Sequence, residues 1–176
     1  MRCRNLSLKY SIDQANELIR ENEKRKRYFT KIISPRFSDC IYERKIHFSK
    51  FFEFFEMARF DIMHDFYDFY ETKMQPNKNI SLGNFVVVRV QCENYESLNM
   101  SIHGNVSIKT ALIVHQKPLL EFEQIAIENQ HNQSLIKANI KIAIVDTSFN
   151  KVENWDDDIL LAMLEFINTY GKEEQR

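Results

Sequence analysis

The sequence predicts an α+β fold in which an antiparallel sheet wraps around one long central helix. The first observation is the segment from Phe48 to Tyr70, whose apolar residues recur every three or four positions without proline or glycine. Its apolar arc is so wide that another layer must cover the helix on most sides. The second observation is a run of strand-like segments after it. No helical crossover separates them, which favours antiparallel pairing.

Further elements follow from local patterns. Ser11 to Arg27 predicts an amphipathic helix that opens with a Ser11–Gln14 capping box, and residues 28–34 alternate as a strand that a proline ends. Beyond the central helix, four alternating, β-branched segments predict strands, with "NQHN" as a hairpin connection between the last two. These segments are residues 84–92, 105–115, 119–128 and 134–146.

A last helix is predicted near the end of the chain. Asn154 is its expected N-cap, three aspartates lie in its first turn, and Gly171 lies near its end. We therefore expect two parts: an N-terminal helical extension, residues 1–27, and a sheet-and-helix domain, residues 28–176.

Composition limits the classes of function. The 176 residues are 44% hydrophobic and 28% charged with net charge −1, which suits a single packed core and gives no reason to expect nucleic acid or an anionic membrane as partner. Three separated cysteines argue against a disulfide framework or a zinc site and suit a reducing compartment. Neither a membrane span nor a secretory signal is recognisable, so the expected location is cytoplasmic.

Two motifs carry a family resemblance. "RFSDC" at residues 36–40 resembles a strand end, and "FFEFFEMAR" at residues 51–59 resembles a helix pattern, with Glu56, Ala58 and Arg59 in place. Together with the later strands, the chain resembles hot-dog thioesterases of the 4-hydroxybenzoyl-CoA thioesterase type. The resemblance implies a hot-dog fold, hydrolysis of acyl-CoA or acyl-carrier-protein thioesters, and assembly as a homodimer or a dimer of dimers.

The loop before the long helix departs from the family pattern. The position of the family's catalytic aspartate is occupied by Ile41, and Asp39 takes the place of a first, non-catalytic acid. Enediyne-type polyketide thioesterases resemble this chain, because they also lack the acid and carry phenylalanine and arginine at the positions of Phe48 and Arg59. The asparagines of that branch are absent here, since Lys45 and Lys50 stand in their places.

Two functions therefore stay open. One is an acyl thioester hydrolase with a degenerate catalytic loop. The other is a non-catalytic hot-dog protein that binds an acyl chain or a protein partner. A dehydratase of the same fold is disfavoured, because its histidine-bearing motif is absent.

The expected catalytic residues lie at the start of the long helix. Amides of Phe48 and Ser49 would hold the thioester oxygen, His47 would assist the attacking water, and Arg59 would stabilise negative charge. Alternatively, His47 is a helix cap and Arg59 pairs with Glu56 or Asp39. The expected substrate-binding residues are Phe51, Phe52, Phe55 and Asp39, although the phenylalanines also fit a hydrophobic core.

Other sites have weaker support. His64 with Asp61 and Asp68 has helical spacing that could hold a metal, but a charged helix face explains it more simply, so no metal is expected. With only three glycines, phosphate-cradling loops are not expected. No cofactor is expected. The basic run at residues 23–27 fits a solvated helix end or a contact with a phosphate or an acidic carrier protein.

Overall fold

The computed structural model describes residues 12–41, 45–73, 84–93, 104–115, 119–145, 152 and 157–173. Within these residues the fold consists of three α-helices, six strands and one short 3-10 turn. The helices are α1 (Ile12–Lys24), α2 (Phe48–Lys73) and α3 (Asp157–Tyr170), and the turn is η2 (Phe37–Asp39). The strands are β1 (Arg27–Ile33), β2 (Asn84–Glu93), β3 (Val106–Val114), β4 (Leu119–Glu128), β5 (Gln133–Val145) and β6 (Lys172–Glu173).

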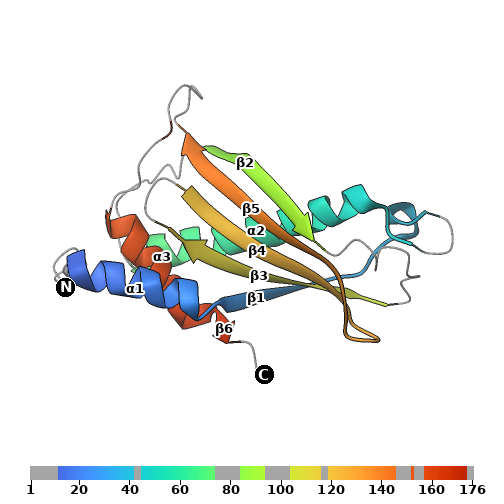
Figure 1. Cartoon of the computed structure of the whole chain (residues 1–176), viewed down its shortest axis with the longest axis horizontal. Coiled ribbons are helices and arrows are strands. Elements are labelled where there is room, and N and C mark those ends of the chain that lie inside the picture. Colours follow the sequence, from blue (N-terminus) through green and yellow to red (C-terminus); the bar gives the residue numbers. More distant parts are fainter. Residues whose placement is uncertain are drawn as a thin grey trace.

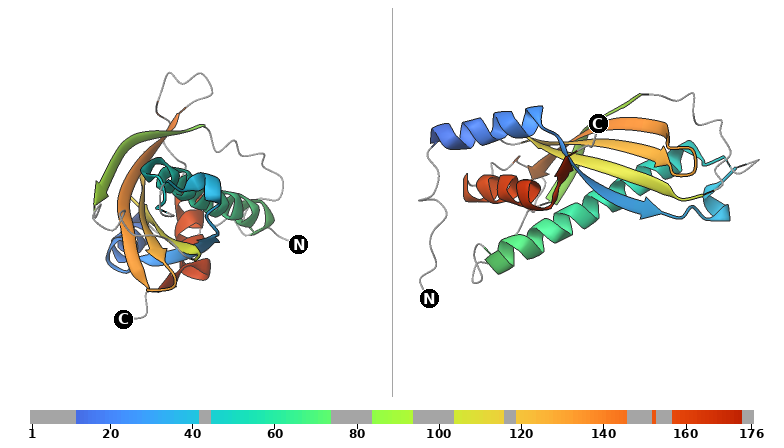
Figure 2. Two further views of the ribbon diagram at one scale, coloured as in Figure 1. Left: turned by 90° about the vertical axis from the view of Figure 1, so that its right-hand side faces the viewer. Right: turned by 90° about the horizontal axis from the view of Figure 1, so that it is seen from below.

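The strands form one antiparallel sheet in the order β2-β5-β4-β3-β1-β6. The sheet curves around α2, which runs along its concave face and packs against β1, β3 and β4 (Figures 1 and 2). Helix α3 closes one end of this core, and α1 packs on β3 and α3. The predicted hot-dog architecture is therefore confirmed, with its added N-terminal and C-terminal helices.

Aromatic side chains fill the space between α2 and the sheet. Phe55 and Phe66 of α2 are fully buried, as is Phe122 on β4. At the α3 end, Phe166 stacks on Phe29 of β1 with ring centroids 5.4 Å apart. The long apolar arc of α2 thus has the expected role of forming the core, because both the sheet and α3 cover it.

One flank of α2 is an exception to this burial. Met57 is 46% exposed and Phe60 is 64% exposed on α2, and Phe60 lines the same cavity as Val87 of β2, which is 48% exposed. The arc predicted burial on most sides, but the sheet covers α2 mainly through β1, β3 and β4. This flank and β2 therefore leave apolar surface in solvent.

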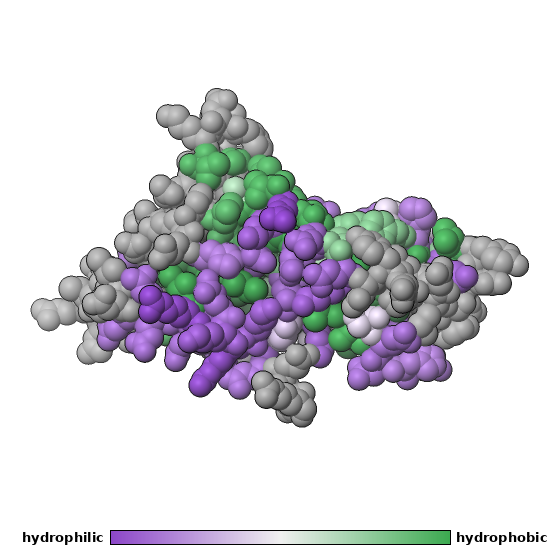
Figure 3. Space-filling view, viewed as in Figure 1, coloured by the Kyte–Doolittle hydropathy of each residue, from purple (hydrophilic) through white to green (hydrophobic). Residues whose placement is uncertain are grey.

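The opposite face of the sheet is polar. Glu121 and Lys141 are paired across β4 and β5, and Glu123 pairs with Lys137. In Figure 3 the face turned to the viewer is largely hydrophilic, and hydrophobic side chains gather toward β2 at its upper edge. Alternating strands place one residue on the core and the next in water, which explains this division.

The remaining expectations concern the helix caps, the short elements and the domain division. Ser11 and Asn154, the expected helix caps, lie outside the described residues. The 3-10 turn η2 and the strand β6 were not predicted, because each is short and carries no periodicity. The division at residue 27 stays a prediction. Among the described residues, no helix is long and apolar enough to cross a membrane.

Candidate functional site

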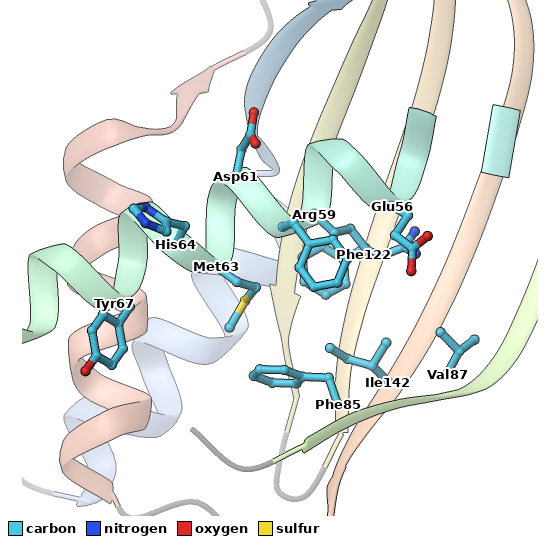
Figure 4. Close-up of a pocket in the computed structure, with 11 residues that line it drawn as sticks. Glu56, Arg59, Asp61, Met63, His64, Tyr67, Phe85, Val87, Phe122 and Ile142 are labelled. Atoms are coloured by element: carbon cyan, nitrogen blue, oxygen red, sulfur yellow. The ribbon is translucent and has the colours of Figure 1, made fainter. Parts of the chain in front are cut away.

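A cavity of about 480 Å³ lies between α2 and the β2 side of the sheet. Its walls are mostly apolar, and Figure 4 shows Met63 facing Phe85 and Ile142 across this space. Such a volume is ordinary for a small-molecule site. The residues that line it are Glu56, Arg59, Phe60, Asp61, Met63, His64 and Tyr67 of α2, Phe85 and Val87 of β2, Phe122 of β4, and Ile142 of β5.

Arg59 enters this cavity from the middle of α2. Its Nη1 donates a hydrogen bond of 2.6 Å to Oε1 of Gln124 on β4. Gln124 is fully buried, and its Nε2 donates to the Phe55 carbonyl at 2.9 Å and to the Thr110 hydroxyl at 3.0 Å. The guanidinium therefore has a fixed direction, because every polar atom of the glutamine that holds it is itself paired.

The electrostatic setting of Arg59 is unusual for a cation. Burial lowers the pKa of its guanidinium from the ordinary value, and the charge of Glu56 opposes that shift. Within the described part of the chain, Gln124 is its one hydrogen-bond acceptor. An arginine has five N–H donors, so the geometry leaves donors that can meet a carbonyl or carboxylate oxygen in the cavity.

The start of α2 is arranged differently from the expectation. His47 Nδ1 lies 2.7 Å from the Ser49 hydroxyl and accepts a hydrogen bond of 3.3 Å from the Ser49 amide. His47 is therefore a helix cap, the alternative that its position before the helix had left open. Its Nδ1 is thus engaged with Ser49, and the catalytic role of His47 stays a prediction.

The predicted catalytic residues are spread along the first half of α2 and the residue before it. Arg59 follows Phe48 by eleven positions, which is about 16 Å along a helix axis. The Ser49 amide, expected as an oxyanion donor, is engaged by His47. A joint catalytic role of Arg59 and the groups at the helix start stays a prediction.

The predicted substrate-binding residues do not line the cavity either. Phe51 and Phe55 are buried in the core, and Phe52 packs edge-on against Phe48 with centroids 5.0 Å apart. Asp39 accepts a hydrogen bond of 2.7 Å from the Arg36 amide and lies 3.8 Å from Lys50 Nζ, so it fastens the loop before α2.

Sequence reasoning missed the strand side of the cavity wall. Phe60 and Met63 belonged to the recognised apolar arc, but Phe85, Val87 and Ile142 were seen only as strand residues. The available signal was the excess width of the arc on α2. More apolar surface than the core needs indicates that part of it faces a cavity or a partner.

The weaker candidates are occupied by internal pairs. Asp61 forms an ion pair with Lys31, and His64 Nδ1 lies 3.5 Å from Asp68. No group of three metal-ligating side chains occurs in the portion of the chain that the structure describes. In the basic run, Lys26 pairs with Glu123 at 2.7 Å and Arg27 with Glu173 at 3.2 Å, so these two cations are engaged within the fold.

Comparisons with known proteins were made for both sequence and structure. No family model and no curated protein matches the sequence. The structure is similar to a predicted thioesterase from Bacillus stearothermophilus, with 18% identity, a TM-score of 0.60, and 79% of this chain and 96% of that chain covered.

Two more solved structures agree. A probable thioesterase from Escherichia coli has 16% identity and a TM-score of 0.59, covering 77% of this chain and 97% of that chain. A 1,4-dihydroxy-2-naphthoyl-CoA thioesterase from Synechocystis has 12% identity and a TM-score of 0.59, covering 77% of this chain and 95% of that chain. The chain therefore shares the hot-dog fold of these proteins.

Proposed function

We propose that the protein is an acyl thioester hydrolase whose acyl group occupies the cavity between α2 and β2. The observation that carries this proposal is a half-buried arginine, Arg59, in the wall of a mostly apolar cavity of about 480 Å³. An apolar acyl chain fits the walls, and the thioester oxygen fits the guanidinium. Solved structures of the same fold carry thioesterase names, which supports the same class of reaction.

Arg59 would act on the oxygen of the thioester carbonyl. When water attacks the carbonyl carbon, that oxygen becomes an oxyanion, and a fixed cation nearby lowers the barrier. The Gln124 hydrogen bond holds the guanidinium before substrate arrives, so little reorganisation is needed at the reaction step. Apolar walls lower the local dielectric and so strengthen this electrostatic effect.

The substrate class that fits is an acyl thioester of CoA or of an acyl carrier protein. Its acyl part is apolar where it meets Met63, Phe85 and Ile142. A carrier or CoA would remain outside the cavity, bound by other surface. CoA and an acyl carrier protein present the same thioester carbonyl to the cavity. Only an experiment with both substrates can therefore tell which one the protein uses.

A second copy of the chain is the proposed partner. Strand β2 ends the sheet with an unpaired edge among the described strands, and Met57, Phe60 and Val87 expose apolar side chains beside it. Edge strands with apolar neighbours are covered in stable proteins, and a two-fold dimer covers both copies at once. The partner would then form an outer wall of the cavity and exclude water from it.

Release of free thiol from a panel of acyl-CoA and acyl-carrier thioesters tests the proposed activity. We expect turnover by the unaltered protein, and a loss of about 10²- to 10³-fold in kcat for Arg59→Met, the range found when one oxyanion donor is removed. Arg36→Met is the matched control, since that side chain does not line the cavity. Ile41→Asp and His47→Ala should leave the rate within about 3-fold.

A binding protein without turnover is the second candidate. It is favoured by the residue at the family's catalytic acid position, Ile41, which is apolar and 54% exposed. If no thioester is hydrolysed but a non-hydrolysable acyl-CoA ether binds with a calorimetric signal that Arg59→Met abolishes, this second function replaces the first. Absence of both hydrolysis and binding rejects the cavity as a functional site.

A further inference from the structure

We propose that Glu56 is the general base of this reaction and replaces the acid that is missing at Ile41. The inference rests on the proposed thioester hydrolysis and adds the residue that activates water. The residue that activates the attacking water then lies on α2 itself, one turn away from the arginine that stabilises the oxyanion.

Glu56 lies beside Arg59 in the cavity wall. Glu56 and Arg59 are three residues apart on α2 and both line the cavity. In a helix, residues at this spacing lie on the same face. Figure 4 shows the Glu56 carboxylate and the Arg59 guanidinium at the same end of the cavity. A carbonyl held by Arg59 would therefore have a carboxylate on the adjacent turn of the same helix.

The Glu56 side chain is also exposed, so it can meet a water molecule. The other carboxylate in the cavity wall, Asp61, is paired with Lys31. His64 lies against Asp68, and the Tyr67 hydroxyl is hydrogen-bonded to Glu71. Among the described residues, Glu56 makes no hydrogen bond and its charge acts on Arg59, so its carboxylate oxygens can meet a water molecule in the cavity.

The charges support the same division of roles. Arg59 has one neutral acceptor and the Glu56 charge close by, so the wall holds one cation and one anion on adjacent turns. The cation suits the carbonyl oxygen, which gains negative charge, and the anion suits the water, which loses a proton. Neither role requires the histidine at the start of the helix.

The chemical steps balance with water as the only co-reactant. Glu56 takes a proton from water as the water oxygen bonds to the carbonyl carbon, and the carbonyl electron pair moves to oxygen beside Arg59. The oxyanion then collapses, the carbon–sulfur bond breaks, and the sulfur leaves with that electron pair. The proton held by Glu56 passes to the thiolate, leaving a free thiol and a carboxylic acid that ionises in water.

Steady-state kinetics on Glu56→Gln test the proposal. Glutamine keeps the shape of the side chain and cannot accept the proton, so kcat should fall by about 10²- to 10⁴-fold with KM changed less than about 3-fold. Glu56→Asp should keep part of the activity. In the original protein kcat should fall as the pH is lowered, and in Glu56→Gln this fall should be absent. A merely structural role of Glu56 would not change this pH dependence.

Glu53→Gln is the matched control. Glu53 precedes Glu56 by three residues on the same helix, is exposed, pairs with Lys50 and does not line the cavity. Its replacement should leave kcat within about 3-fold, and thermal unfolding should show both variants folded. An active protein whose Glu56→Gln variant keeps its rate overturns the role of Glu56 alone. An unaltered protein that hydrolyses nothing overturns the proposed function, and this inference with it.

Discussion

Arg59 donates to Gln124 across the core, and this hydrogen bond joins the middle of the long helix to the middle strands of the sheet. The two residues are 65 positions apart, and Gln124 is 0% exposed. The same glutamine also holds the Phe55 carbonyl and the Thr110 hydroxyl. One buried amide therefore sets both the position of α2 on the sheet and the direction of the guanidinium in the cavity.

Replacing Gln124 with leucine should destabilise the protein by about 1–3 kcal/mol. The change keeps a similar volume but leaves Arg59 and the Thr110 hydroxyl without their partner, and an unsatisfied buried polar group costs about that much. Urea unfolding followed by circular dichroism measures the effect. Gln91→Leu, on the exposed part of β2, should change stability by less than about 0.5 kcal/mol. A Gln124→Leu protein as stable as the original would show that the hydrogen bond between Arg59 and Gln124 does not stabilise the fold.

Phe55→Ala should cost about 3–5 kcal/mol of unfolding free energy. Phe55 is 0% exposed between α2 and the sheet, and truncation leaves a cavity that the packed core cannot close. Phe37→Ala is the control, because that ring is 93% exposed and its loss should change stability by less than about 0.5 kcal/mol. Equal effects from the two variants would contradict the assigned core.

Asn22 attaches helix α1 to strand β3. Its Oδ1 accepts from the Val114 amide at 3.0 Å, and its Nδ2 donates to the Leu112 carbonyl at 3.4 Å. These β3 groups lie beyond Ala111, where the pairing with β1 ends, so the asparagine completes the ladder. Asn22→Ala should cost about 1–3 kcal/mol by leaving a buried amide unpaired.

Hydrogen exchange gives the sharper measurement of this contact. The Val114 amide should exchange faster in Asn22→Ala, while amides in the β4–β5 pairing keep their protection. Glu21→Ala on the exposed side of α1 is the control and should leave Val114 protected. Unchanged Val114 exchange in the Asn22 variant would mean that another group satisfies the amide.

Glu123 is expected to make the free energy of unfolding depend on pH in the acidic range. Burial raises the pKa of its carboxyl, but hydrogen bonds from Lys26, Lys137 and Tyr28 outweigh burial, and the net pKa is lowered. A carboxyl with a lowered folded pKa stabilises the fold above its unfolded value of about 4.5, and that stability disappears as the pH falls through the folded pKa.

The measurement compares Glu123→Gln with the original chain. The original should lose unfolding free energy steeply below about pH 4.5, and the variant should show a shallower slope over the same range. Glu173→Gln changes an exposed partner of Arg27 and should leave the slope as it was. Parallel curves for Glu123→Gln and the original would exclude this carboxylate as a source of that pH dependence.

Phe60→Asp tests the proposed dimer. Phe60 is 64% exposed on the uncovered flank of α2, and a charge there opposes burial of that flank against a second copy. Light scattering at micromolar concentration should report a dimer for the original chain and a monomer for the variant. Phe37→Asp, at an exposed aromatic away from the flank, should remain dimeric. A monomeric original chain would reject the partner.

The elements were predictable from the sequence because their signals are local. The three- and four-residue spacing from Phe48 onward requires a helix, and the alternation in residues 119–128 requires a strand with one buried face. Strands in succession without crossovers then leave an antiparallel sheet as the layer that covers the helix. Hydrophobic periodicity, which depends only on neighbours in the chain, was sufficient for this part of the fold.

Tertiary packing decided the site. Arg59 could pair with Glu56, with Asp39 or with a substrate as far as the sequence shows, and its partner is Gln124 on a strand far along the chain. Met57 and Phe60 are exposed because α2 lies on β1, β3 and β4 and leaves β2 uncovered. The periodicity that places a residue on one face of a helix carries no information about which strand meets that face. That choice follows from the order and register of the strands, which bring residues 65 positions apart into hydrogen-bond contact.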